Sequence, residues 1–253
     1  MAYEAFAEVY EELMDNVPYD EWCQRILDIL RAEGIRDGLV AELGCGTGSM
    51  TRRLQDAGYD MIGIDSSPDM LEIARESEEE GSRILYLNQD MRSFELYGTV
   101  RAVTSVCDSI NYVTDPEEVG EVLRLVNNYL DPEGILILDF HTPRYYSEVL
   151  GDASIAETRE DMAMIWENEE SEDGLHRLYL TIFREDADGR YERFEELHLQ
   201  RGYTPEEMKA LAKKAGLVDI RFYDGYTDRP AAAESDRIVM IAREHGKSAA
   251  RNQ

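Results

Sequence analysis

The sequence predicts an α/β protein in which a mostly parallel sheet carries a small antiparallel insertion. Three observations lead to this prediction. Short apolar segments alternate with helical ones up to residue 140, a glycine-rich turn closes the first apolar segment, and longer alternating segments fill residues 151–200. Strands that alternate with helices form βαβ units and a parallel sheet, whereas consecutive strands form hairpins. The length of 253 residues suits one large domain with an insertion.

The N-terminal segment predicts helices. Apolar side chains recur at helical spacing in residues 3–13 and again in residues 22–30. The residues between them contain Pro18, which breaks a helix. We therefore expect a helical cover over residues 1–36.

Five short strands and three helices follow this cover. The strands are expected at residues 39–43, 61–64, 84–87, 102–106 and 135–140. The helices are expected at residues 51–57, from Pro68 onward, and at residues 116–129. Ser67 supplies an N-cap to the second helix, and Pro68 is its first residue. The last strand is apolar enough to be buried on both faces, and a turn is predicted before it at residues 131–134.

The pattern changes after residue 146. Three longer strands are predicted at residues 162–168, 175–184 and 190–200, with turns at 172–174 and 186–189. A helix capped by Thr204 and two closing strands, at residues 218–223 and 237–242, complete the chain. The predicted domains are the cover, a large domain of residues 37–145 and 204–245, and an insertion of residues 146–203.

The charge of the chain argues against several classes of partner. With 26 basic and 54 acidic side chains, the net charge is −28 at pH 7. Nucleic acids and anionic membrane surfaces are bound by clustered Lys and Arg, so neither is expected as a partner. No segment approaches the roughly 20 apolar residues of a membrane span, and the acidic N-terminus is unlike a signal peptide. The three scattered cysteines do not form a disulfide framework, so we expect a cytoplasmic protein.

The glycine-rich turn points most directly to a ligand. Gly44, Gly46 and Gly48 follow the first strand, and Asp65 ends the second strand 21 residues after Gly44. Glycines let a ligand approach the backbone closely. A carboxylate at the position of Asp65 can accept hydrogen bonds from the hydroxyls of a ribose.

Two further positions favour a cationic nucleoside over a dinucleotide. Glu42, two residues before the first glycine, would repel a pyrophosphate but attract an ammonium or sulfonium group. The dinucleotide pattern also needs a glycine at position 49, where this chain has Ser49. The alternative is a tight turn in which Glu42 is only a structural partner.

Four segments together resemble the motifs of class I S-adenosylmethionine-dependent methyltransferases. They are residues 42–48, 63–71, 88–91 and 130–136. The resemblance implies a Rossmann-like sheet of seven strands with an antiparallel last strand, and S-adenosyl-L-methionine as the cofactor. The N-terminal aromatic residues and the insertion are similar to those of a bacterial small-molecule group that includes sugar N-methyltransferases, in which the insertion covers the acceptor site.

The resemblance also implies a set of cofactor-binding residues. They are Tyr10, Tyr19, Trp22, Glu42, Gly44, Cys45, Gly46, Gly48, Asp65, Ser66, Met70, Asp90, Met91 and Cys107. Glu42 is expected at the methionine amino group, Asp65 at the ribose, and Asp90 with Met91 at the adenine. Alternatives remain open, because Asp65 and Asp90 could cap local turns and the three aromatic residues could simply pack in the core.

Three residues are candidates for catalysis. His141 follows the fifth strand, His198 lies on the last strand of the insertion, and Tyr112 follows the fourth strand. An amine acceptor needs only to be neutral, whereas a hydroxyl usually needs a general base, for which histidine is suited near neutral pH. We predict that His141 or His198 orients or deprotonates the acceptor; the alternative is that both line the site without proton transfer. No grouping of residues suggests a metal site.

The predicted function is transfer of a methyl group to a nitrogen or oxygen of a small molecule. A protein or tRNA acceptor, a nicotinamide dehydrogenase and a non-catalytic cofactor-binding module are the alternatives. A homodimer is the candidate assembly.

Residues 151–200 hold fifteen acidic and five basic side chains. These acids either form a solvated outer face or, where they point inward, select a cationic acceptor.

Overall fold

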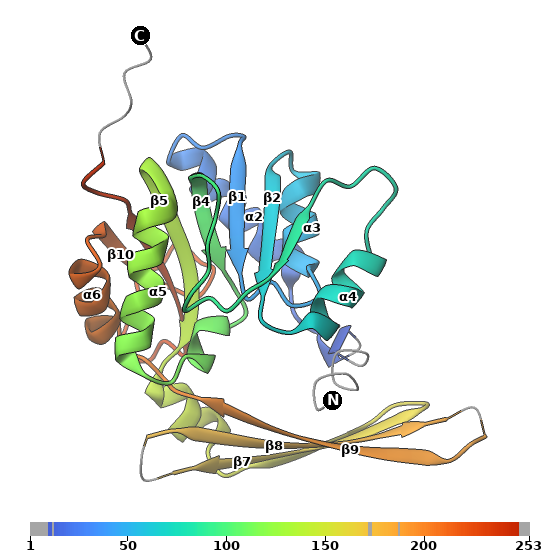
Figure 1. The fold of residues 1–253 in the computed structure, drawn as a ribbon. Helices are drawn as coiled ribbons and strands as arrows, with labels where there is room; N and C mark the ends of the chain where they lie inside the picture. The colour runs from blue at the N-terminus through green and yellow to red at the C-terminus, as the bar shows by residue number, and fades with distance from the viewer. Residues whose placement is uncertain (1–9, 12, 172–173, 187, 248–253) are drawn as a thin grey trace.

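The computed structural model describes residues 10–247 apart from residues 12, 172–173 and 187. Its strands form two sheets (Figure 1). A seven-stranded sheet has the order β10-β11-β5-β4-β1-β2-β3, and a four-stranded sheet has the order β6-β7-β8-β9. Most of the predicted helix at residues 3–13 and part of both predicted turns of the insertion lie outside the described residues.

The large sheet confirms the predicted fold class. Its strands are β1 (Leu39–Leu43), β2 (Asp60–Asp65), β3 (Leu85–Asn88), β4 (Val100–Ser105), β5 (Leu130–His141), β10 (Val218–Asp224) and β11 (Arg237–Arg243). The last strand, β11, runs antiparallel to both of its neighbours, and the other pairs are parallel. The strand order reverses between β1 and β4, and ligands of open α/β sheets bind beyond the carboxyl ends of the strands at such a point.

α-Helices connect and flank the strands of the large sheet. They are α2 (Tyr19–Ala32), α3 (Ser49–Asp56), α4 (Pro68–Glu76), α5 (Pro116–Tyr129) and α6 (Pro205–Lys214). The predicted caps are confirmed, because the Ser67 side chain accepts from the Met70 N–H and Thr204 forms a capping box with Glu207.

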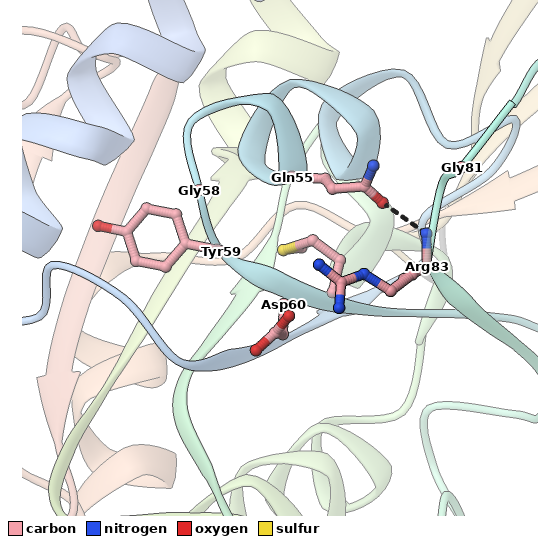
Figure 2. Close-up of a pocket in the computed structure, with 7 residues that line it drawn as sticks. Gln55, Gly58, Tyr59, Asp60, Gly81 and Arg83 are labelled. Carbon is pink, nitrogen blue, oxygen red and sulfur yellow. Dashed lines mark hydrogen bonds between the residues drawn. The ribbon is translucent and has the colours of Figure 1, made fainter. Parts of the chain in front are cut away.

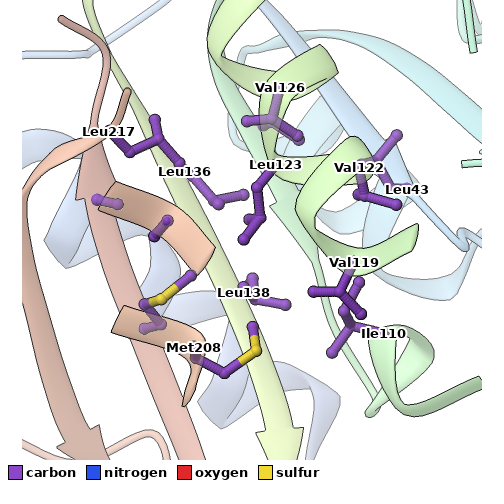
Figure 3. Packing of buried hydrophobic residues seen from close by; sticks show 14 of the residues in the cluster. Leu43, Ile110, Val119, Val122, Leu123, Val126, Leu136, Leu138, Met208 and Leu217 are labelled. Atoms are coloured by element: carbon purple, nitrogen blue, oxygen red, sulfur yellow. The ribbon is translucent and has the colours of Figure 1, made fainter. Parts of the chain in front are cut away.

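Apolar residues cover both faces of the large sheet. On one face, Val119 and Leu123 of α5 and Met208 of α6 pack over Leu136 and Leu138 of β5 (Figure 3). On the other face, the apolar side of α2 and of α3 packs against β1, β5 and β11. Burial on both faces explains why residues 135–138 of β5 form a continuous apolar run.

The small sheet lies across the carboxyl end of the large sheet (Figure 1). Its strands are β6 (Ser154–Thr158), β7 (Met162–Glu170), β8 (His176–Glu185) and β9 (Tyr191–Gln200), all antiparallel. The expected three strands are therefore four. We did not predict β6, because four of its five residues are exposed and its sequence lacks the apolar alternation of a half-buried strand.

The predicted turn at residues 131–134 is instead a bulge within β5. Val100 pairs with Leu130, but Ala102, two residues later, pairs with Ile135. Glu133, within this irregular stretch, has a φ of 64°. The extra residues are thus absorbed without ending the strand.

Two short helical segments, neither of them predicted, shape the carboxyl edge. They are the 3₁₀ helix η1 (Ser109–Tyr112) after β4 and the π-helix η2 (Tyr145–Leu150) after β5. Cys107 and Asp108, just before η1, have φ values of 55° and 51°. Within the described part of the chain, none of the helices has the length and apolar character needed to cross a bilayer.

Candidate active site

The glycine-rich loop between β1 and α3 is tied to the end of β2. Gly44, Gly46 and Gly48 have φ values of 66°, 53° and 79°, which favour glycine. The Gly46 N–H donates to Asp65 Oδ2 at 2.8 Å, and the Ser67 N–H donates to Asp65 Oδ1 at 2.8 Å. Burial raises the pKa of Asp65, and these N–H groups partly oppose that shift. Asp65 therefore fixes the loop at the edge of the sheet.

The three glycines differ in what surrounds them. A Cβ atom on Gly44 would lie 2.6 Å from Ser109 Cβ, and one on Gly48 would overlap the Tyr86 hydroxyl. A Cβ atom on Gly46 would meet nothing within 4 Å. Gly44 and Gly48 thus allow close packing, whereas Gly46 faces open space into which a ligand can fit.

Glu42 is a buried carboxyl group beside this loop. It lies on β1, is 1% exposed, and accepts a hydrogen bond from the Thr51 hydroxyl of α3. Burial raises the pKa of Glu42 to about 8, although the Thr51 hydrogen bond partly opposes this shift. A cation placed here would restore the charged form. This donor set fits the ammonium and sulfonium groups of S-adenosylmethionine better than a polyanion.

Two N-terminal tyrosines approach the end of β4. The thiol of Cys107 lies 3.7 Å from the Tyr19 hydroxyl. Desolvation raises the pKa of Tyr10, and the neighbouring Tyr19, Cys107 and Tyr112 add to the shift. The structure thus brings these four predicted residues together. Trp22 lies to one side, stacked on Tyr226 with ring centroids 4.5 Å apart.

The remaining predicted cofactor residues lie around the loop. The Met91 methyl would be 3.2 Å from a Cβ on Gly44, which places it at the loop. The Asp90 carboxylate is paired with the Arg92 guanidinium at 2.5 Å, and this hydrogen bond lowers its pKa. Asp90 thus has a protein partner, so its contact with adenine stays a prediction. Of the other three, Cys45 and Met70 are buried and Ser66 is exposed.

Arg237 joins two carboxylates at the edge of the sheet. Its guanidinium donates to Asp108 Oδ1 and to Asp139 Oδ2, both at 2.6 Å. The Asp108 N–H donates to Asp139 Oδ1 at 2.7 Å, and the Tyr226 hydroxyl donates to Asp139 Oδ2 at 2.8 Å. Burial alone would raise the pKa of Asp108, but the positive charge of Arg237 holds it below its ordinary value.

Sequence reasoning missed this cluster, although one signal was available. Asp139 lies within an apolar strand, and a charged residue in such a place is almost always paired. Its partner Arg237 opens the last strand, 98 positions away, so nothing local in the sequence identifies the pair.

His141 makes contacts that fix its tautomer. Its Nδ1 lies 3.1 Å from the Asp236 carbonyl oxygen, and its Nε2 lies 2.7 Å from Arg237 Nη2. A carbonyl only accepts and a guanidinium only donates, so Nδ1 carries the proton and Nε2 accepts. Burial lowers the pKa of His141, and its ring stacks on Tyr145 with centroids 3.6 Å apart. This geometry favours the alternative in which His141 takes no proton.

His198 and Tyr112 come together from separate elements. The Tyr112 hydroxyl lies 3.3 Å from His198 Nδ1, and His198 Nε2 lies 3.2 Å from Glu196 Oε2. Two positions further along β9, the Gln200 amide donates to Asp108 Oδ2 at 3.3 Å. The inner face of β9 is therefore held against the carboxyl edge of the large sheet. Glu196 and Gln200 are additions to the predicted site.

A separate pocket opens at the other end of β2 (Figure 2). Its lining comprises Gln55, Gly58, Tyr59, Asp60, Met61, Gly81 and Arg83. Gln55 accepts a hydrogen bond from the Arg83 N–H at 3.4 Å. Asp60 begins β2 and Asp65 ends it, so this pocket lies away from the glycine-rich loop and contains none of the predicted site residues.

The comparisons with known proteins decide the family. Residues 40–134 match the family described as methyltransferase domain. YqeM of Bacillus subtilis, which is named as a methyltransferase, is 35% identical over 96% of this chain and 97% of its own length. The chain belongs to the methyltransferase family. Among solved structures, an S-adenosylmethionine-dependent methyltransferase from Clostridium acetobutylicum superposes with a TM-score of 0.87 and 26% identity, over 97% of this chain and 100% of its own.

These findings confirm the predicted family, enzyme class and cofactor. The methyltransferase uses S-adenosylmethionine, so the alternative of a nicotinamide dehydrogenase is wrong. Another relative matches a shorter part of the chain. A dTDP-3-amino-3,4,6-trideoxy-α-D-glucopyranose N,N-dimethyltransferase of Streptomyces venezuelae is 27% identical over 52% of this chain and 53% of its own length.

Proposed function

We propose that this methyltransferase acts on a nitrogen or oxygen of a small molecule held between the large and small sheets. The observation that carries the proposal is the inner face of β9. His198 and Gln200 are 3% and 8% exposed, and they turn toward Tyr112 and Asp108. Polar side chains buried in this way, beyond the carboxyl ends of parallel strands, are suited to orienting a ligand.

The roles proposed for the cofactor-binding residues are those that the family resemblance implies. Glu42 would bind the methionine ammonium, Asp65 would accept from the ribose hydroxyls, and Gly46 would leave room for the cofactor. S-adenosylmethionine supplies a methyl group bound to a positively charged sulfur. The protein would hold the acceptor so that its lone pair is in line with the bond between this methyl group and sulfur, and sulfur would keep the electron pair of that bond.

The protein contributes mainly alignment and exclusion of water. Well-aligned reacting groups reach effective molarities on the order of 10⁵ M or more. Of the histidines, His198 with Tyr112 is the better placed to receive a proton from the acceptor. The His141 Nε2 already accepts from Arg237, so His141 helps to position that cluster.

Two observations support a small acceptor over a macromolecule. The net charge of −28 opposes the binding of tRNA. The Streptomyces relative is named as a dimethyltransferase of a nucleotide-linked amino sugar, which is a small molecule.

The test is turnover on small acceptors. The purified enzyme is incubated with S-adenosylmethionine and a panel of nucleotide-linked amino sugars and their hydroxyl counterparts. Formation of S-adenosylhomocysteine and a mass gain of one methyl group are measured. His198→Ala should lower kcat by about 100-fold or more if His198 is a general base. His245→Ala, at an exposed position, is the matched control. Methylation of protein or RNA but of no small molecule would refute the proposal.

A second outcome concerns the histidines alone. If His141→Ala and His198→Ala both keep turnover near that of the wild type, neither histidine transfers the proton. In that case the acceptor reacts as a neutral nucleophile, and the proposed acceptor site would stand without a general base.

A further inference from the structure

Glu196 differs from every other acid of residues 151–200 whose exposure the structure describes. Its side chain is 4% exposed, whereas each of the others is at least partly exposed. Its neighbour on the same strand, Glu195, points the opposite way and has a side chain that is 62% exposed. Glu196 is therefore the acid that the small sheet turns inward.

The Glu196 carboxylate lacks the donors that a buried carboxylate needs. Its Oε2 lies 3.2 Å from His198 Nε2, but this pair is not aligned as a hydrogen bond. Neither carboxylate oxygen accepts a hydrogen bond from any residue that the structure describes. The residue paired with it across the sheet is Leu180, which is 2% exposed. A buried carboxylate among apolar side chains is costly unless donors reach it.

The residues around Glu196 indicate which kind of ligand could donate hydrogen bonds to its carboxylate. On the same face of β9, His198 approaches Tyr112 and Gln200 approaches Asp108. Glu196 thus belongs to the surface that faces the proposed acceptor site. An ammonium group supplies both hydrogen-bond donors and a compensating charge, whereas a hydroxyl supplies one neutral donor.

We infer that Glu196 determines specificity by binding a protonated amine of the acceptor. This inference rests on the proposed function and narrows its substrate class to basic amines. It concerns recognition of the amine as a cation. A protonated amine has no lone pair, so the methyl group goes to another atom of the acceptor, or to this nitrogen only after it has lost its proton. The strongly negative charge of the protein would also raise the local concentration of such a cation.

The binding test compares two probes of the same shape, cyclohexylamine and cyclohexanol. Their dissociation constants are measured by ligand-observed NMR on enzyme saturated with S-adenosylhomocysteine. The wild type should bind the amine at least about tenfold more tightly than the alcohol, since hydrogen bonds to charged groups contribute about 10- to 100-fold. Glu196→Gln should remove this preference, and Glu195→Gln should keep it. Equal binding of the amine by wild type and Glu196→Gln, or no binding by the wild type, would overturn the inference.

A melting experiment tests the same inference without any acceptor. If the Glu196 carboxylate awaits a ligand, Glu196→Gln should raise the melting temperature by about 2–4 °C or more, because it removes a buried charge. A fall in melting temperature would show a structural role and overturn the inference. Titration of the wild type and of Glu196→Gln with S-adenosylhomocysteine separates the two proposals. If the wild type does not bind S-adenosylhomocysteine, the proposed function is contradicted. If both proteins bind it equally, any difference in amine binding is due to Glu196 alone.

Discussion

The affinity for S-adenosylmethionine should rise with pH between 6 and 7, because Glu42 must lose a proton to bind the ammonium group. Burial raises the pKa of Glu42 to about 8 in the free protein. The ionised fraction then grows from about 1% at pH 6 to about 9% at pH 7. The ammonium stays charged over this range, so the association constant should rise about ninefold, or about 1.3 kcal/mol.

Isothermal titration calorimetry can measure both the affinity and the proton. In buffers of different ionisation enthalpy at pH 6.5, binding should release nearly one proton per site, because the complex favours ionised Glu42. Glu42→Gln keeps a side-chain oxygen for Thr51 but cannot ionise, so its affinity should be low and independent of pH. A wild-type affinity that does not change with pH, or the same slope in Glu42→Gln, would refute this role. Because Glu42→Gln retains Asp65, any pH dependence of the affinity that comes from the Asp65 carboxyl would persist in the variant and could be told apart from that of Glu42.

Three further predictions concern stability. Because the pKa of Glu42 is raised, the unliganded folded state keeps a proton that the unfolded state loses above a pH of about 4.5. The stability of the wild type should therefore fall as the pH rises toward 8. Thermal melts of Glu42→Gln should not show this fall. Gly48→Ala, with a φ of 79° and a Cβ that overlaps the Tyr86 hydroxyl, should lower the free energy of unfolding by about 1–3 kcal/mol in denaturant titrations. Arg237→Met should cost about 3–5 kcal/mol in the same titrations, since it leaves the fully buried carboxylate of Asp139 without its cation.

Local patterns were sufficient to predict most of the large sheet. The range 39–43 predicted for the first strand is that of β1, a largely apolar segment closed by Gly44. The helix at Pro116–Tyr129 likewise has the predicted bounds, because Asp115 caps it and Pro116 begins it. Such local patterns do not predict β6, because its residues gain their conformation from pairing with β7.

The proposed acceptor site depends on contacts that no local sequence pattern predicts. Glu196 is one of fifteen acids in its segment, and strand alternation says only that it and Glu195 face opposite ways. Which face is inward depends on where the small sheet lies. That is set by contacts such as the one from Gln200 to Asp108, 92 residues apart.

The difference between the two sides of the site has a physical origin. The proposed cofactor site is a turn whose backbone must adopt positive φ values, and such a turn requires particular residues at fixed spacing. The proposed acceptor site is lined by side chains that project from a separate sheet. There, a substitution at an inward position such as Glu196 leaves the backbone hydrogen bonds between the strands unchanged. Sequence resemblance therefore identifies the cofactor, whereas the acceptor must be inferred from which side chains are buried and which polar atoms lack partners.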